Sequence, residues 1–239
     1  MGESLTGLRA ILVLSAHWRT DRPQFTAAAA PNTLHDFRGF GAERHAMTGP
    51  APGAPELAAQ AAALTDGTLD PHRGLDHGVW VPLSLLRPNA DIPVVQAALP
   101  TAGLRAAYTL GRHLRPLRAE GVAIIGSGGV VHNLNDLNRS QDAVETPWAR
   151  AFADWVDGRL HTQDLGAVFN FRQIAPYGAR AHPTEEHFAP LLAALGGGRT
   201  PGEAASERHI WIDDHGWVGV RLNPPPGYAK PPRLRAPRS

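Results

Sequence analysis

The chain has 239 residues, a formal net charge of +1 and no cysteine. This length suits one α/β domain with a buried core, and the nearly balanced charge argues against a nucleic-acid partner. Without cysteine, disulfides and thiolate metal sites are excluded, so any metal ion must be held by aspartate, glutamate or the 12 histidines. The chain shows neither a run of about 20 apolar residues nor a cleavable signal, which predicts a cytoplasmic protein.

The first predicted element is a buried strand over residues 8–18. Its centre, Ile11 to Leu14, is apolar without alternation, which is typical of a strand covered on both faces by helices. His17 lies at the carboxyl end of this strand. Because ligands bind outside the carboxyl ends of the strands in open α/β sheets, we expect this histidine to serve chemistry.

Apolar periodicity and breakers predict the remaining elements. In chain order these are a long connection over 19–53, a helix over 55–64, a turn over 73–80 leading into a helix that ends near 87, a buried strand over 92–99, a helix reaching about 120, a buried strand over 122–125, a helix over 148–160, an irregular segment over 170–181, a helix starting at 183–188 and ending at 196–198, and a hairpin of strands 208–213 and 217–222. The pattern predicts a single α/β domain over 1–222 with a mostly parallel central sheet flanked by helices, its active site at the strand carboxyl ends, and a disordered tail over 223–239.

Local signals refine three of these elements. Thr101 and Thr184 are expected to cap the helices that follow them, which would place His187 in a first helical turn facing the core. The glycines of 126–129 are expected to form a tight turn after the third strand. This glycine segment fits neither the Walker loop nor the dinucleotide fingerprint, which disfavours nucleotide binding.

Four histidines occupy positions for which the sequence gives a reason. His17 ends a strand, His77 lies in a glycine-flanked turn, His132 follows the glycine segment, and His187 starts a helix. Taken singly, each is most simply a hydrogen-bonded structural or surface residue. Taken together, they are candidates for one site, because residues distant in sequence meet where strand ends converge.

The motifs around these histidines resemble the type II extradiol ring-cleavage dioxygenases, in particular the DOPA 4,5-dioxygenase branch related to the catalytic subunit of protocatechuate 4,5-dioxygenase. The resemblance covers residues 8–222 and rests on six motifs in order: Ser-Ala-His17-Trp, His35-Asp36-Phe37-x-Gly39-Phe40, Ala51-Pro52-Gly53-x-Pro55, Gly74-Leu75-Asp76-His77-Gly78-x-Trp80, Gly126-Ser127-Gly128-x-x-x-His132-Asn133-Leu134 and Pro183-Thr184-x-Glu186-His187. Six motifs in sequence are far more specific than any one of them.

The resemblance implies a mononuclear non-haem Fe(II) site, with zinc in some bacterial relatives, that acts on a catechol-type aromatic diol and O2. His17 and His187 would be metal ligands, and His132 would be both a metal-site residue and the acid/base catalyst. His77 would line the substrate pocket and assist catalysis. Asp76 is a candidate for orienting His77 or binding substrate, and Phe37 is a candidate for the pocket mouth.

One departure from the family pattern concerns the beginning of the chain. Family members normally begin with a further strand that ends in Gly-His-Gly-Ser-Pro and supplies another ligand, and residues 2–7 do not match it. Three explanations stay open: a start codon placed too far downstream, a shortened enzyme with a replacement ligand, or a relative that has lost catalysis. The candidate replacement ligands are His35, His182 and His215.

The leading hypothesis is therefore an extradiol dioxygenase. The alternatives are a catalytically degenerate metal-binding member of the same family and a zinc hydrolase, for which Glu186 is the only adjacent carboxylate. An acidic residue in a first helical turn is, however, usually explained by the helix dipole. The sequence leaves open which catechol is the substrate, which metal is bound and whether the chain is a monomer or a homodimer.

Overall fold

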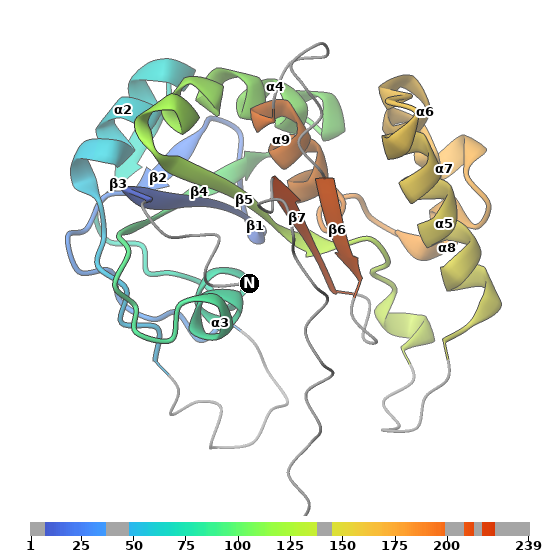
Figure 1. Cartoon of the computed structure of the whole chain (residues 1–239), viewed down its shortest axis with the longest axis horizontal. Helices are drawn as coiled ribbons and strands as arrows, with labels where there is room; N and C mark the ends of the chain where they lie inside the picture. Colours follow the sequence, from blue (N-terminus) through green and yellow to red (C-terminus); the bar gives the residue numbers. More distant parts are fainter. Residues whose placement is uncertain (1–7, 37–47, 138–144, 199–207, 213–216, 223–239) are drawn as a thin grey trace, which may run out of the picture.

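The computed structural model describes residues 8–36, 48–137 and 145–198 with their side chains, and the backbones of strands 208–212 and 217–222 (Figure 1). These residues form a seven-stranded sheet in the order β3-β2-β4-β1-β5-β7-β6. The strands are β1 (Ala10–Thr20), β2 (Gln24–Thr26), β3 (Thr68–Asp70), β4 (Val94–Pro100), β5 (Val122–Gly129), β6 (Arg208–Ile212) and β7 (Trp217–Leu222). The helices are α2 (Pro55–Thr65), α3 (His77–Leu86), α4 (Leu104–Leu114), α5 (Pro147–His161), α6 (Leu165–Phe169), α7 (Phe171–Ile174), α8 (Gly178–Ala181) and α9 (Ala189–Gly197), with 3-10 turns η2 (Arg115–Glu120) and η3 (Leu134–Asp136).

The centre of the sheet is parallel, as the apolar runs predict. β1 lies between β4 and β5 and pairs parallel with both. The pairings β2–β4, β5–β7 and β6–β7 are antiparallel, and the last of these is the predicted carboxyl-terminal hairpin. The prediction of a single α/β domain with a parallel central sheet is therefore confirmed, with antiparallel strands added toward both edges.

Helices cover both faces of β1. Leu12 and Leu14 pack in a cluster with α2, α4 and α9, whereas Ile11 and Val13 pack in a second cluster with α3. Figure 1 shows the first three helices on one side of the sheet and α3 on the other. Because successive side chains of a strand point to opposite faces, the unbroken apolar run of β1 is what this double cover requires.

The segment between the third buried strand and α9 differs from its prediction. Residues 170–181, expected to be irregular, contain the short helices α7 and α8. Phe171 at the start of α7 packs against Phe152 of α5 and Phe188, and the three rings surround His182. This aromatic cluster, a tertiary contact, stabilises helices too short to form alone.

Two helix starts also differ from the prediction. α4 begins after Gly103, which has a φ of 92°, so Thr101 is not its cap. The helix continues as the 3-10 turn η2 because Pro116 cannot donate the hydrogen bond of an α-helix. Gly121 ends η2 in the left-handed region, which agrees with the predicted end near residue 120. α9 begins at Ala189, so Thr184 is not its cap and His187 lies in the turn before the helix.

The glycines of 126–129 belong to β5 and do not form the expected turn. They give the strand a surface without side chains, on which the start of α9 lies directly. A Cβ at Gly126 would lie 2.2 Å from the carbonyl oxygen of Pro190. Glycine in a strand interior often marks such a close approach of another backbone. The predicted tail over 223–239 lies outside the described residues.

Candidate metal centre

Four histidine rings predicted from the sequence lie next to one another. The ring centroids of His17 and His77 are 3.9 Å apart, those of His17 and His187 are 5.0 Å apart, and those of His132 and His187 are 3.3 Å apart with nearly parallel planes. The residues come from β1, the start of α3, the segment after β5 and the turn before α9. The convergence of distant imidazoles near the carboxyl ends of the central strands is the main expectation from the sequence.

His17 is positioned by an irregularity in β1. The pairing of β1 with β4 shifts register between Leu14 and Arg19, and His17 lies inside that interval. Such irregularities often re-aim a side chain next to an active site. The α3 helix approaches closely here because its second residue is Gly78, where a Cβ would lie 2.4 Å from Ser15 Oγ and 3.1 Å from His17 Cδ2.

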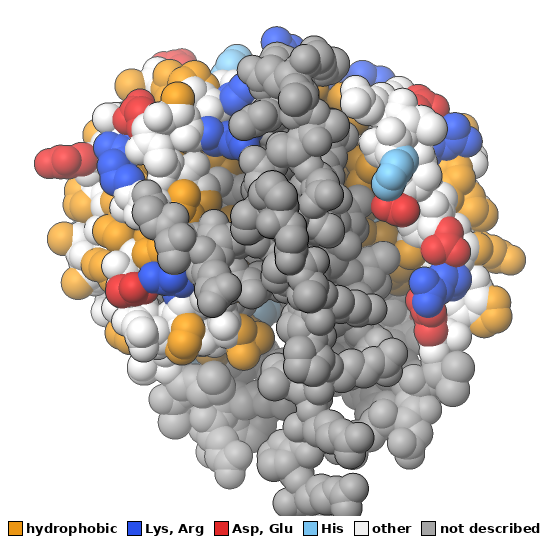
Figure 2. All heavy atoms as spheres, in the orientation of Figure 1, with side chains coloured by type: hydrophobic (Ala, Val, Ile, Leu, Met, Phe, Trp, Pro, Cys, Tyr) orange, Lys and Arg blue, Asp and Glu red, His pale blue; other side chains and the backbone are white. Residues whose placement is uncertain are grey.

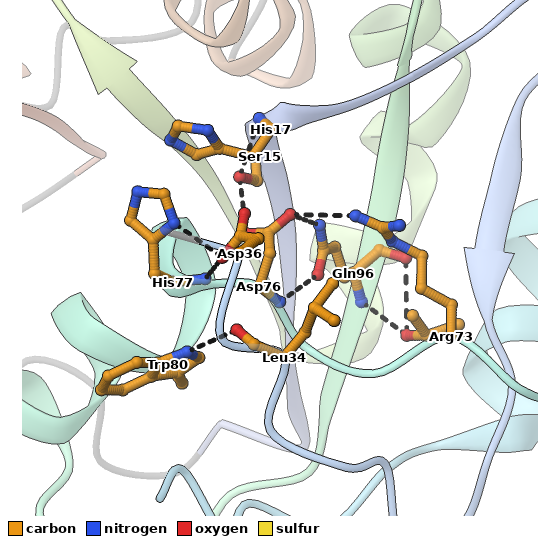
Figure 3. Close-up of polar contacts among 10 residues, drawn as sticks. Ser15, His17, Leu34, Asp36, Arg73, Asp76, His77, Trp80 and Gln96 are labelled. Atoms are coloured by element: carbon orange, nitrogen blue, oxygen red, sulfur yellow. Dashed lines mark hydrogen bonds and ion pairs between the residues drawn. The ribbon is translucent and has the colours of Figure 1, made fainter. Parts of the chain in front are cut away.

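His77 is held by Asp36, which lies 41 residues earlier in the chain. One carboxylate oxygen of Asp36 accepts a hydrogen bond from the backbone N–H of His77 at 3.0 Å and lies 2.7 Å from its Nδ1 (Figure 3). An ionised carboxylate can only accept, so Nδ1 carries the proton of this bond. These bonds lower the pKa of Asp36 to about 2, although burial alone would raise it.

The stacked pair His132 and His187 is brought together by backbone contacts of β5. The N–H of Gly129 donates to the carbonyl of His187 at 3.0 Å, and the N–H of His132 donates to the carbonyl of Ala181 at 2.9 Å. A Cβ at Gly128 would lie 2.3 Å from the same His187 carbonyl. The strand glycines therefore set the distance between the two rings.

Glu186 supports His187 from its own segment. Its Oε1 accepts from the hydroxyl of Thr184 at 2.8 Å and lies 3.3 Å from Nδ1 of His187. Such a carboxylate typically fixes the tautomer of a metal-binding histidine and leaves Nε2 as the ligand atom. Because Glu186 is engaged in this way, its geometry fits support of a ligand better than the general base of a zinc hydrolase.

Two groups of side chains among the described residues have ligand atoms that all lie within 4.8 Å of one another. One group is His17, Asp36 and His77, and the other is His132, Glu186 and His187. The predicted ligand set of His17, His132 and His187 is thus divided between the groups. The neighbouring rings of His17 and His187 connect the two groups.

Burial favours the neutral form of the His17, His132 and His187 imidazoles. Desolvation lowers the pKa of His17, with repulsion from a charged His77 as the next cause, and desolvation also lowers the pKa of His132. For His187, desolvation together with the neighbouring His132 and His17 lowers the pKa to about 3. Neutral imidazole is the form that binds metal ions, so the site is prepared for a cation near neutral pH.

Asp76 has a place different from the predicted one. Its side chain is fully buried, and one carboxylate oxygen points toward Ser15, next to His17. The carboxylate accepts hydrogen bonds from Ser15 Oγ at 2.8 Å, from the amide of Gln96 and from Arg73 at 3.4 Å (Figure 3). Ser15 Oγ in turn accepts from the backbone N–H of His17 at 3.3 Å. A fully enclosed carboxylate cannot touch substrate, so its place fits support of β1 beneath His17.

The other candidates lie apart from the cluster or outside the described residues. His182 is fully buried and its Nε2 donates to the carbonyl of Val130 at 2.6 Å, while the His35 ring packs against Trp80. Neither belongs to the two groups of possible ligands. Phe37 and His215 lie outside the described residues.

A cavity of about 290 Å³ lies beside Glu186. Arg19, Thr101, Arg172 and Thr184 are among its other lining residues, so both positive and negative side chains border it. On the coloured part of the face in Figure 2, basic and acidic side chains are interspersed rather than gathered by sign. A surface of mixed charge fits a small ligand better than an extended polyanion. Among the described helices, none has the length and apolar character to cross a membrane.

Comparison with known proteins agrees with this arrangement. Residues 4–215 match the family model described as the catalytic LigB subunit of aromatic ring-opening dioxygenase. The chain is 42% identical over 220 residues to "4,5-DOPA dioxygenase extradiol" of Portulaca grandiflora, covering 88% of this chain and 80% of the relative. It is 38% identical over 204 residues to the Escherichia coli K12 protein of the same name, covering 82% and 75%.

A solved structure shares the fold. The crystal structure of an uncharacterized protein from Escherichia coli K12 superimposes with a TM-score of 0.75 at 32% sequence identity. The match covers 92% of this chain and 88% of the other. The shared fold therefore agrees with the sequence motifs and with the histidine cluster.

Proposed function

Because this chain belongs to the LigB family of aromatic ring-opening dioxygenases and is an extradiol-type enzyme, we propose that it inserts O2 into a catechol-type aromatic at a mononuclear non-haem Fe(II) site. The ring would open next to one hydroxyl group. The names of several relatives make DOPA the first catechol to test.

The donor set supports a divalent ion. His17 and His187 are the proposed ligands, with His132 beside them, and their lowered pKa values favour the neutral ligand form. Imidazoles with carboxylate support are the donors of non-haem iron and of catalytic zinc. When bound, the iron supplies open coordination positions for the catechol and O2 and a route for electrons between them.

The protein's own groups would handle the protons. His132 is the proposed acid/base residue, since its lowered pKa leaves the ring neutral and able to accept a catechol hydroxyl proton near pH 7. His77, whose ring lies beside that of His17, would assist. After ring opening, the protonated imidazole would return its proton to the product.

The observation that carries the proposal is the adjacency of the His17, His132 and His187 rings, from three distant segments of a chain with this family's motifs. The test is to load the protein anaerobically with Fe(II), admit air and offer a panel of catechols, including DOPA. We expect oxygen uptake that depends on the catechol, together with the coloured ring-opened semialdehyde. Absence of both from folded, iron-loaded protein would favour the degenerate metal-binding alternative.

A further inference from the structure

The contact between Asp36 and His77 joins two parts of the site that lie far apart in the sequence. Asp36 lies just beyond the isolated bridge between Thr33 and Leu75, which fixes its loop beside the start of α3. The backbone contacts of this bridge include the N–H of Leu34 donating to the carbonyl of Leu75 at 2.8 Å. The loop is therefore anchored where it delivers the carboxylate.

The carboxylate of Asp36 takes the place of a helix cap. Asp76 precedes α3, but its side chain makes no cap hydrogen bond because it is directed into the buried network beneath β1. The N–H of His77, the first residue of the helix, is satisfied instead by Asp36. A negative charge at this position is also favoured by the helix dipole.

The same oxygen of Asp36 binds the ring of His77. Because one atom accepts from both the backbone N–H and Nδ1, the imidazole is tied to the start of the helix at two points. Turning the ring over would break the bond to Nδ1. The proton therefore stays on Nδ1, and Nε2 is the nitrogen with a lone pair. In Figure 3, Nε2 lies on the side of the ring away from Asp36 and toward His17.

We propose that Asp36 is a positioning residue of this site, whose carboxylate holds His77 in the Nδ1–H tautomer so that Nε2 accepts a proton from the catechol substrate. This inference rests on the proposed dioxygenase function. The charge of Asp36 would also stabilise the imidazolium that forms when Nε2 takes the proton. Asp36 itself would touch neither substrate nor metal.

Asp70 offers a matched control. Like Asp36, it uses one carboxylate oxygen to accept two N–H bonds, from the backbones of His72 and Arg73 at 2.9 Å each. It binds no imidazole through these bonds. Asp70→Asn removes the charge of a carboxylate that orders a loop but does not change the tautomer of any histidine. It therefore measures the effect of the lost charge alone.

The first test is a two-bond proton–nitrogen NMR spectrum of the imidazoles in zinc-loaded, ¹⁵N-labelled protein. The signals of His77 are assigned by their absence from His77→Gln. We expect a protonated Nδ1 and an unprotonated Nε2 in the unmodified protein and in Asp70→Asn, and a mixture of tautomers in Asp36→Ala. A proton on Nε2 in the unmodified protein would overturn the proposal, and this result does not depend on catalytic activity.

The second test is a double-mutant cycle on ring cleavage. We expect Asp36→Ala to lower kcat by about 10- to 100-fold, as loss of a supporting carboxylate does, with KM changed much less and bound metal unchanged. Asp36→Asn, which keeps an oxygen acceptor, should retain part of the rate, and Asp70→Asn should retain all of it.

In a His77→Gln background, Asp36→Ala should cause no further loss. An equal loss in both backgrounds, or loss of metal from Asp36→Ala, would show that Asp36 acts by another route. If the unmodified enzyme cleaves no catechol, the proposed function fails while the NMR result still decides the tautomer.

Discussion

Gly128 of β5 lies so close to His187 that a Cβ at the glycine would be 2.3 Å from the His187 carbonyl oxygen. The next residue, Gly129, donates its backbone N–H to that same oxygen. The strand and the turn before α9 therefore touch backbone to backbone. This contact places the His187 ring against His132. It also explains why β5 contains glycines at 126–129, which local sequence rules would assign to a turn.

We expect Gly128→Ala to push the His187 turn away from β5 and weaken both folding and metal binding. Overpacking of this kind typically costs about 1–3 kcal/mol of unfolding free energy. Gly158→Ala is the control, because it lies exposed in α5 with no atom within 4 Å of the new Cβ, and it should stabilise by about 0.5–1 kcal/mol. Urea unfolding and bound-metal stoichiometry measure both. Equal metal content in the two variants would contradict this account.

The buried carboxylate of Asp76 makes a second prediction. Asp76→Ala would leave Gln96 and Arg73 without their shared acceptor and should lower the free energy of unfolding by roughly 3 kcal/mol or more. Glu120→Gln, which removes the half-exposed ion pair with Arg9, should cost less than about 1 kcal/mol. Denaturant midpoints compare the two, and similar shifts would mean that the buried network is not a support of β1.

Metal affinity and turnover should distinguish the proposed metal ligands from the proposed proton-transfer residues. We expect His17→Ala and His187→Ala each to weaken metal affinity by more than about 100-fold, beyond the loss typical of supporting residues. His77→Gln should keep the metal and lower kcat to a reduced but measurable value. His161→Ala, whose side chain is 83% exposed, should change neither property. Metal analysis after anaerobic loading decides the matter, and retention of metal by His17→Ala would refute its assignment.

His182 predicts a pH dependence of stability. Burial lowers its pKa from 6.5 to about 4, so between these values the unfolded chain binds a proton that the folded chain does not. The free energy of unfolding is therefore unaffected by this histidine above pH 6.5. It decreases as the pH falls toward 4, by on the order of 3 kcal/mol. His182→Gln, whose amide can still donate to Val130, should lack this loss. Parallel slopes for the two metal-free proteins in urea unfolding between pH 7 and 4 would contradict the prediction.

Much of the fold follows from local patterns. The runs in β1, β4 and β5 are apolar without alternation, and this pattern alone predicts strands covered on both faces. α2 begins at its proline as predicted. The pattern could not give the antiparallel pairing of β2 with β4, since the order of strands depends on contacts between distant segments.

The errors share one physical cause, which is that tertiary contacts override local signals. Thr184 looks like a cap, but its hydroxyl bonds to Glu186, and α9 begins later with Pro190 in its first turn. Proline is favoured at that position, so Pro190 was an available signal for the true helix start. The site histidines were found from motifs. Asp36 belongs to the motif His35-Asp36-Phe37, but no role was predicted for it, because its contact with His77 joins segments 41 residues apart.

The central claim is that His17 and His187 bind one divalent ion. Crystals grown anaerobically with Fe(II), with diffraction measured at the iron absorption edge, test it most directly. An anomalous difference peak contacted by the imidazoles of His17 and His187 is the predicted result. A map without a peak there, or with the iron bound elsewhere on the protein, would contradict the account.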